Sequence, residues 1–588
     1  MSSQRPVVAA SRHAISSGHQ LATEAGSAIL DAGGNAVDAG VAAGIALGVL
    51  HCDLVNFAGV APIMIRMAET GKVITIDGLG TWPQAASVEF FEKQHGGAIP
   101  EGILRTVVPA APAAWITALE KFGTMTFGEV AAAAVQYAAE GFPAFKVFAE
   151  FIANNQAKYQ RHAENSRIFL PNGRPPEVGE LIVQKDLAAS LNYMIDQERA
   201  AKGDRKQGLK AAYDAFYRGD IAHTLSDYHR DNGGFLSLED MAGYSVRFEE
   251  PLKVNFGDAD IYCCGAWSQG ISLAQIFAML DDLDVVKFGH NSPDYIHQLT
   301  EALKLVFADR EQYVADPRFI DVPVSEMLER DYLIGRANLI DAGRAWPEMP
   351  PAGDPLARQP TAPGSAVHAT AIQNGGDAHA TKPQESTPVG GPDCADTSYV
   401  CVIDEAGNMF SATPSDTSAD TEVIPGTGLC ASSRGSQSRG ISSSINAVAP
   451  GKRPRLTPNP ALAVKDGKPF MTFGTPGGDV QIQAMVQVYL NAVCFGMDIQ
   501  AAVEAPRFAS YSFPSSFAPN DYFPGLLMLE GRLSDETGAE LLSRGHKVEW
   551  WPDYTWKAGG VCAIKADAET GILYAGADPR RAAYAMGR

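Results

Sequence analysis

The stretch DTSYVCVIDEAGN, residues 396–408, contains the strand from which the rest of the chain is interpreted. Residues 397–404 are rich in β-branched side chains, which predicts a strand, and EAGN predicts a turn before a second strand at 409–413. The first strand follows residues 347–392, which are rich in Pro, Gly, Ala, Ser and Thr. Such a composition predicts a solvated segment without a core. This segment is either a linker or a tail left when a precursor is cut.

Thr397 stands where the tail ends and the strand begins. A hydroxyl is a weak nucleophile and needs a base. A threonine at a chain N-terminus has such a base in its own α-amine, which titrates near pH 8. Thr397 gains that amine only if the bond between Asp396 and Thr397 is cut. The alternative is an ordinary strand threonine.

The sequence TPGG, Thr475 to Gly478, precedes a predicted helix at residues 480–495. Adjacent glycines allow backbone N–H groups to converge on a developing oxyanion, and a helix N-terminus adds to the field there. The alternative is a simple turn between strand and helix. Together with Thr397, the turn indicates acyl-transfer chemistry.

Strand and helix patterns alternate around these two features. Strands are predicted at residues 72–78, 460–464 and 469–473, and helices within 18–49, 110–210 and 301–314. Strands with hairpins and interspersed helices indicate a mixed α/β sandwich.

Composition excludes several classes of partner. Acidic residues outnumber basic ones by 68 to 47, a net charge of −21, which disfavours nucleic acid. No apolar run is long enough for a membrane span, and the N-terminus has no signal core. Eight scattered cysteines without a CxxC pattern predict a reduced, cytoplasmic protein. No cofactor is expected, and no metal either, although His51, Cys52 and Asp53 lie together.

Several blocks of the sequence resemble the γ-glutamyltranspeptidase superfamily, in the same order and over nearly the whole length. They include DAGGNAVDAGVAAGIALGV (31–49), ADREQYVADPRF (308–319), DTSYVCVIDEAGN (396–408) and NPALAVKDGKPFMTFGTPGGDVQ (459–481). The resemblance implies the four-layer αββα sandwich of N-terminal-nucleophile hydrolases. It also implies self-cleavage into a large chain, 1–396, with a tail at about 347–396, and a small chain, 397–588. These would form one αββα domain as a heterodimer, with further pairing to a heterotetramer left open.

The resemblance assigns roles to individual residues. Thr397 matches the nucleophile, and Gly477 and Gly478 match the oxyanion-hole glycines. Ser415 falls where the family has a threonine that supports the nucleophile and assists self-cleavage. Thr413 matches a nearby strand threonine that is more structural, and it is kept as a further candidate for substrate contact.

Three groups that recognise substrate in the γ-glutamyl enzymes are replaced here. Leu79 replaces the arginine that binds the substrate α-carboxylate, and Thr417 replaces an asparagine. The acidic pair that receives the α-ammonium is replaced by Ser436 and Gln437. Leucine cannot form the bidentate pair that an arginine gives a carboxylate.

The segments that contain Arg434 and Arg455 resemble the branch of the superfamily that contains oxamate amidohydrolase and cephalosporin- or glutaryl-type acylases. Arg434 is the first candidate to bind a substrate anion there, and Arg455 is the second. Thr457 falls where the family has a substrate-contacting serine. Because self-cleavage involves no substrate anion, Arg434 is expected to be dispensable for it.

The leading hypothesis is an amidohydrolase that cleaves a small carboxylate-bearing amide through an acyl-Thr397 intermediate. One alternative is a γ-glutamyl hydrolase or transpeptidase that acts on glutathione-like compounds. Another is an uncleaved homologue that binds a ligand without catalysis. The retained Thr397, Ser415 and TPGG turn favour an enzyme.

Overall fold

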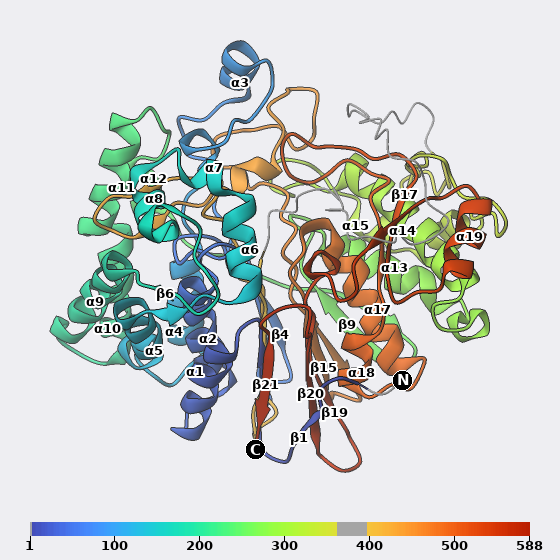
Figure 1. Cartoon of the computed structure of the whole chain (residues 1–588), viewed down its shortest axis with the longest axis horizontal. Helices are drawn as coiled ribbons and strands as arrows, with labels where there is room; N and C mark the ends of the chain where they lie inside the picture. The colour runs from blue at the N-terminus through green and yellow to red at the C-terminus, as the bar shows by residue number, and fades with distance from the viewer. Residues whose placement is uncertain (1–2, 362–396) are drawn as a thin grey trace.

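Two stacked seven-stranded sheets form the centre of the computed structural model, which describes residues 3–361 and 397–588 (Figure 1). Neighbouring strands in both sheets are antiparallel. The first sheet has the order β1 (Val8–Ala10), β20 (Leu573–Ala577), β19 (Cys562–Ala566), β15 (Lys468–Gly474), β14 (Ala461–Lys465), β9 (Ala259–Cys263) and β8 (Leu252–Phe256). The second has the order β21 (Tyr584–Gly587), β2 (Ala14–Ser17), β10 (Val400–Ile403), β11 (Met409–Ala412), β3 (Ile63–Arg66), β4 (Val73–Ile76) and β7 (Phe248–Glu249).

The strands predicted around residue 400 form the hairpin β10–β11. Its register places Val400 opposite Ala412 and Ile403 opposite Met409. All four residues of β10 are buried, as expected for a strand that is covered on both faces. The predicted strand pair at 460–473 is confirmed as β14 and β15, and the helix after the glycine turn as α17 (Gln481–Val493).

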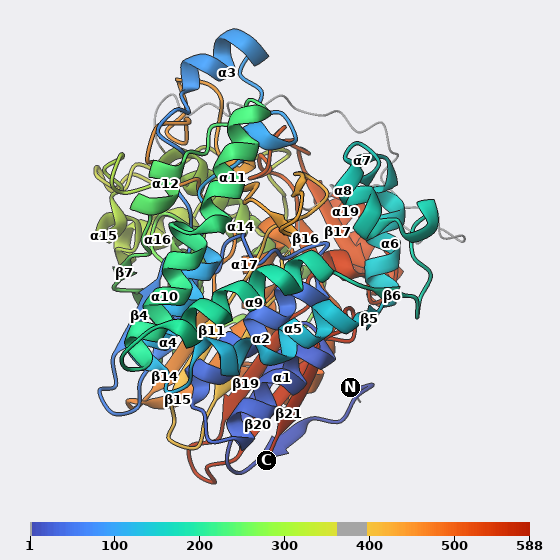
Figure 2. The ribbon, with the colours of Figure 1, turned by 90° about the vertical axis from the view of Figure 1, so that its left-hand side faces the viewer.

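Helices cover the outer face of each sheet (Figures 1 and 2). On the side of the second sheet lie α1 (Gln20–Asp31), α2 (Ala36–Leu50), α4 (Ala111–Phe122), α5 (Phe127–Glu140), α9 (Lys185–Ala200), α10 (Arg205–Tyr217) and α11 (Asp220–Asp231). On the side of the first sheet lie α13 (Gly270–Asp281), α14 (Pro293–Tyr313), α16 (Arg330–Ala337), α17, α18 (Ile499–Glu504) and α19 (Asp535–Ser543). The four layers confirm the predicted αββα sandwich.

Small residues allow close approach between the layers. A Cβ on Gly40 of α2 would lie 2.1 Å from the ring of Phe410 in β11, so only glycine fits there. Between the sheets, a Cβ on Gly474 would lie 2.2 Å from the ring of Tyr399. The end of β15 is therefore held directly against the segment that leads into β10.

Each sheet combines strands from both sides of residue 397. In the second sheet β10 and β11 lie between β2 and β3, and β21, near the C-terminus, pairs with β2. In the described part of the chain, no helix is both long enough and apolar enough to cross a membrane.

Candidate active site

Thr397 lies three residues before β10, a central strand of the second sheet. Its backbone forms an antiparallel bridge with Ser415, and the N–H of Ser398 donates to the carbonyl of Pro414 at 2.9 Å. Thr397 and Ser415 are both fully buried. Their hydroxyl oxygens, Oγ1 and Oγ, lie 2.6 Å apart. The structure thus joins the predicted nucleophile to the predicted supporting hydroxyl by a direct hydrogen bond.

Arg434 approaches the same pair from the 3-10 helix η4 (Arg434–Gln437). Its Nη2 donates to the Oγ of Ser415. The guanidinium lies 5.4 Å from the centre of the Phe517 ring, and only 1% of the residue is exposed. A cation therefore contacts the hydroxyl that itself contacts Thr397, a relationship that the sequence did not predict.

The glycine turn joins β15 to α17 through the short 3-10 helix η5 (Gly478–Val480). Gly477 has a φ of 123° and Gly478 a φ of 55°, both in the region that favours glycine. The hydroxyl of Thr475 accepts from the N–H of Gly560 at 2.9 Å and so ties the turn to a neighbouring loop. The turn has the glycine-dependent backbone that the oxyanion-hole assignment requires.

Thr457 connects the glycine turn to η4. Its hydroxyl accepts from Nε2 of Gln437 at 2.9 Å. The Nε2 of Gln269 donates both to the carbonyl of Thr457, at 2.8 Å, and to the carbonyl of Gly478, at 3.0 Å. These contacts place Arg434, Thr457 and Gly478 in one buried network.

Arg455 belongs instead to a buried ion cluster. Its Nη2 pairs with the carboxylate of Glu311 at 2.6 Å. Burial alone would raise the pKa of Glu311, but Arg455, Arg310 and Arg439 outweigh it and hold that pKa at about 2. Of the two arginines, Arg434 is therefore the one that contacts the Thr397–Ser415 pair, through the Ser415 hydroxyl.

The remaining predicted residues lie at the edge of the site or outside the described chain. The N–H of Thr413 donates to the carbonyl of Pro62 at 3.1 Å, which fits a structural strand residue. Leu79 is fully buried in the apolar core between the sheets. Asp396 lies outside the described residues.

Asp416 is the residue that sequence reasoning missed. Its φ of 141° is unusual for a residue with a side chain, and its carboxylate accepts hydrogen bonds from Ser432 and Ser433. Burial raises the pKa of Asp416, although Arg434 opposes the shift. In the sequence, the only feature that could have pointed to Asp416 is its position directly after Ser415.

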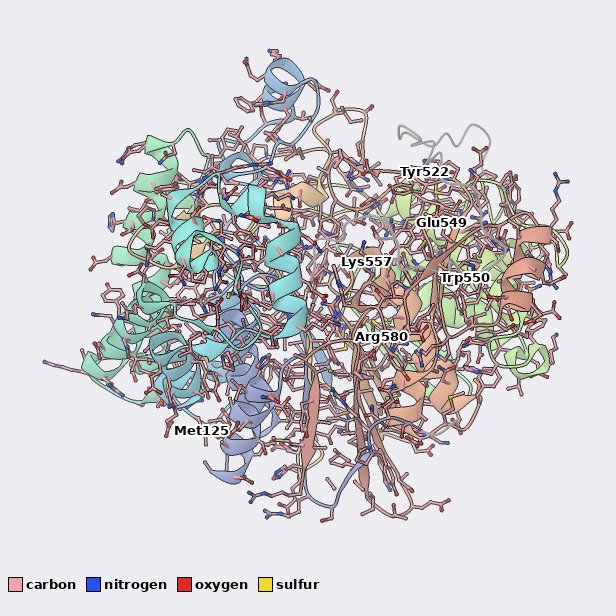
Figure 3. All side chains as sticks on the ribbon, in the orientation of Figure 1. Met125, Tyr522, Glu549, Trp550, Lys557 and Arg580 are labelled. Carbon is pink, nitrogen blue, oxygen red and sulfur yellow. The ribbon has the colours of Figure 1, made fainter. Side chains whose placement is uncertain are left out.

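A cavity of about 1220 Å³ adjoins this network. Thr417, two residues beyond Ser415, and Phe517, beside Arg434, both lie on its wall. Lys557 and Arg580, which are labelled in Figure 3, line it as well. Aromatic and charged side chains from several loops complete the lining, including Phe145, Phe151, Trp551, Tyr554, Trp556, Arg105, Lys158 and Arg581. The cavity has the volume to hold a small-molecule substrate.

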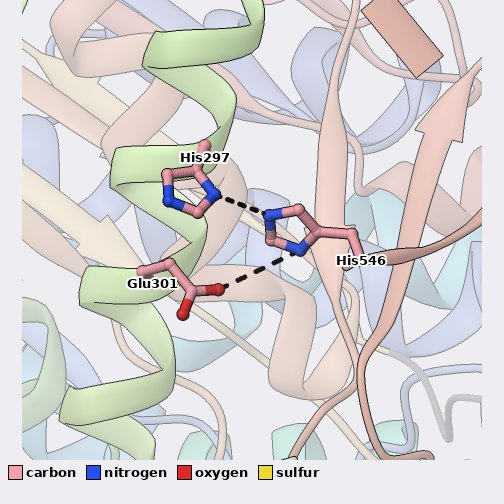
Figure 4. Close-up of side chains that lie close together, drawn as sticks. All are labelled: His297, Glu301 and His546. Carbon is pink, nitrogen blue, oxygen red and sulfur yellow. Dashed lines mark hydrogen bonds and ion pairs between the residues drawn. The ribbon is translucent and has the colours of Figure 1, made fainter. Parts of the chain in front are cut away.

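A separate cluster, formed by His297 and Glu301 of α14 with His546, has the residue types of a metal site (Figure 4). Nδ1 of His297 lies 2.9 Å from Nε2 of His546, and Nε2 of His297 lies 2.8 Å from the carbonyl oxygen of Asp341. Since a carbonyl only accepts, His297 carries its proton on Nε2, and His546 donates to Nδ1 of His297. Glu301 is 4.0 Å from His546 and pairs with Lys304 at 2.7 Å. The ammonium already supplies the charge that a metal would, so the cluster fits a structural brace.

Sequence comparison places this chain in a known family. The profile of the Gamma-glutamyltranspeptidase family matches residues 22–588. The chain belongs to the gamma-glutamyltranspeptidase family. It is 31% identical to the Glutathione hydrolase proenzyme of Bacillus subtilis (strain 168), over 97% of this chain and 91% of that one. It is also 31% identical to the Acylase ACY 1 proenzyme of Pseudomonas sp. (strain SE83), over 94% of this chain and 90% of that one.

A solved acylase structure has the same fold throughout. The crystal structure of cephalosporin acylase from Bacillus halodurans superposes with a TM-score of 0.83 at 25% identity, covering 100% of this chain and 98% of that chain. The relatives of this gamma-glutamyltranspeptidase family member thus include both acylases and glutathione hydrolases.

Proposed function

We propose that this protein is a self-processing amidohydrolase that cuts its chain before Thr397 and then hydrolyses the amide of a small carboxylate-bearing substrate. The observation that carries the proposal is the 2.6 Å contact between the Thr397 and Ser415 hydroxyls at the entry to β10. The relatives named as proenzymes support the processing step.

Self-cleavage begins when Oγ1 of Thr397 attacks the carbonyl carbon of Asp396. The hydroxyl proton passes to the amide nitrogen, the C–N bond breaks, and an ester joins Asp396 to Thr397. Water then hydrolyses the ester, giving the Asp396 carboxylate and restoring the Thr397 hydroxyl. The products are a large chain, 1–396, and a small chain, 397–588, which remain together as one domain.

Turnover uses the groups that cleavage creates. The new α-amine of Thr397 accepts the hydroxyl proton while Oγ1 attacks the substrate carbonyl. The N–H groups of Gly477 and Gly478 stabilise the oxyanion, and the protonated amine gives its proton to the departing ammonia or amine. Water then attacks the acyl-Thr397 ester and releases the acid.

Arg434 is the residue proposed to receive the substrate carboxylate. It is a buried cation that contacts Ser415, and its ring neighbour Phe517 lies on the cavity wall. The similarity to proteins named as acylases supports this reading. The similarity to glutathione hydrolases supports a γ-glutamyl substrate, but Leu79 in the apolar core cannot bind an α-carboxylate.

Purified protein tests the proposal on a denaturing gel. We expect two bands, with the smaller chain starting at Thr397 on N-terminal sequencing. Thr397→Ala should remain a single band without amidase activity. Thr472→Ala, a buried threonine in β15, is the matched control and should be cut. An intact chain with full activity would reject the proposal.

A further inference from the structure

The backbone of Asp416 is held in an unfavourable conformation next to Ser415. Its φ is 141°, a value that residues with a Cβ rarely adopt. Two contacts hold it there, since its N–H donates to the carbonyl of Leu54 at 3.0 Å and its carbonyl accepts from Nδ2 of Asn56 at 2.8 Å. Strain of this kind persists where the surroundings impose it, and it often marks a functional position.

The Asp416 carboxylate accepts hydrogen bonds from the two residues that precede η4. Oδ1 accepts from the N–H of Ser433 at 2.9 Å and from its hydroxyl at 2.6 Å. Oδ2 accepts from the hydroxyl of Ser432 at 2.5 Å. Ser433 is the residue that directly precedes η4, so the carboxylate anchors the chain where this helix begins.

Arg434 is the first residue of η4, and its direction follows from that anchor. Its Nε lies 3.9 Å from Oδ1 of Asp416, and its Nη2 donates to the hydroxyl of Ser415. Asp416 and Arg434 are each only 1% exposed. A buried guanidinium needs a nearby counter-charge, and Asp416 provides one.

We propose that Asp416 is a positioning residue for self-cleavage, because its carboxylate places the Arg434 guanidinium on the Ser415 hydroxyl. With the guanidinium bonded to Oγ, the Ser415 hydroxyl keeps one rotamer and holds Oγ1 of Thr397 toward the bond to be cut. In this proposal Asp416 acts through Arg434 and Ser415. The inference rests on the proposed self-cleavage.

Asp416→Gly separates the carboxylate from the backbone strain, since glycine adopts a φ of 141° freely. We expect this variant to fold with a lower melting temperature, because Arg434 loses its counter-charge, and to cut itself at least tenfold more slowly than wild type. The measurement is loss of full-length precursor with time in cell-free translation. Asp466→Gly is the matched control, because Asp466 is exposed, has a φ of 51° in the turn between β14 and β15, and should cut at the wild-type rate.

A double-mutant cycle with Arg434→Lys distinguishes positioning from general support. If Asp416 acts through Arg434, adding Asp416→Gly to Arg434→Lys should slow cleavage little further. Fully additive losses in the logarithm of the rate would overturn the proposal. Asp416→Asn keeps the shape and loses the charge, so it should cut at an intermediate rate.

The outcomes separate this inference from the proposed function. A wild-type chain that never cuts itself rejects both. A wild-type chain that cuts, together with an Asp416→Gly chain that cuts equally fast, rejects only the role of Asp416. If Asp416→Gly does not fold, Asp416→Asn decides, and a wild-type rate for that variant overturns the proposal.

Discussion

Arg310 and Asp479 form a buried ion pair at 2.5 Å directly behind the glycine turn. Asp479 follows Gly478 in sequence, and it also accepts from the N–H and the hydroxyl of Ser516, at 2.8 Å and 2.6 Å. The next residue, Phe517, lies over the guanidinium of Arg434. One carboxylate therefore connects the turn to the arginine side of the site.

Asp479→Asn should weaken this connection without removing an oxyanion donor. We expect kcat to fall about tenfold, with a smaller change in KM, because the N–H of Gly478 would lose its fixed direction. Steady-state kinetics with the best amide substrate would measure both. An Asp479→Asn enzyme with wild-type kcat would show that the turn keeps its geometry without this pair.

Gly478→Val tests the oxyanion hole itself. A β-branched residue cannot adopt a φ of 55° without strain, so the N–H groups should be misplaced and kcat should fall about 10²- to 10³-fold. Gly467→Val is the control, since Gly467 has a φ of 72° in the exposed turn of the β14–β15 hairpin. Near-normal kcat with normal processing in Gly478→Val would contradict the assignment.

The pH dependence of activity should report the Thr397 α-amine. The amine must be neutral to accept a proton, so activity should fall on acidification with an apparent pKa at or below about 8. The pH profile of kcat/KM would show this limb. A chelator should leave the profile unchanged, and loss of activity that added metal restores would oppose an amine base.

His546 should make the fold sensitive to acid. Burial, with Lys304, His297 and Arg544 adding to it, lowers the pKa of His546 to about 2. In the unfolded chain the imidazole of His546 titrates near 6.5. Below that pH the unfolded state therefore binds a proton at His546, and the folded state does not. The stability contributed by neutral His546 is complete above pH 6.5 and is lost as pH falls, by about 1.4 kcal/mol per pH unit.

His546→Gln should lower the number of protons taken up on unfolding by about one, so its stability should fall less steeply as the pH decreases. Denaturant unfolding at pH 7 and pH 5 would measure the difference, with His223→Gln as the control because His223 is exposed on α11. Equal loss of stability on acidification in wild type and His546→Gln would place the sensitive group elsewhere.

Substrate preference should exclude γ-glutamyl compounds. Binding a γ-glutamyl zwitterion would bury a charge without its partner, which costs several kcal/mol, and each 1.4 kcal/mol is about tenfold in rate. We expect hydrolysis of a small acid amide and negligible transfer from glutathione to a dipeptide. Efficient transfer would refute this prediction.

Arg434→Leu should raise KM for that acid amide or abolish its hydrolysis. The sequence alone predicted that self-cleavage would survive this change, but the contact between Arg434 and Ser415 alters the expectation. Cleavage of Arg434→Leu should slow as well. Wild-type kinetics in this variant would show that another residue binds the substrate carboxylate.

Sequence patterns predicted a mixed α/β sandwich and the two segments that carry Thr397 and Gly478, while the four αββα layers were implied by the family resemblance. Periodicity and turn residues are local, so β10, β14, β15 and α17 could be predicted from neighbouring letters. The contacts of Arg434 with Ser415, and of Asp416 with Ser432 and Ser433, form because the chain reverses direction between residues 416 and 432. No local pattern predicts which buried side chains such a reversal brings together.

The interleaved strand order has a consequence for the severed molecule. With β10 and β11 inserted between β2 and β3, neither fragment owns a complete sheet. Separating the fragments would break the hydrogen bonds that pair β10 with β2 and β11 with β3. The unpaired strand edges would then promote aggregation. In the proposed cleavage the backbone would therefore lose one covalent bond while both sheets remain paired, and Thr397 would stay at the entry to β10 as the new N-terminus.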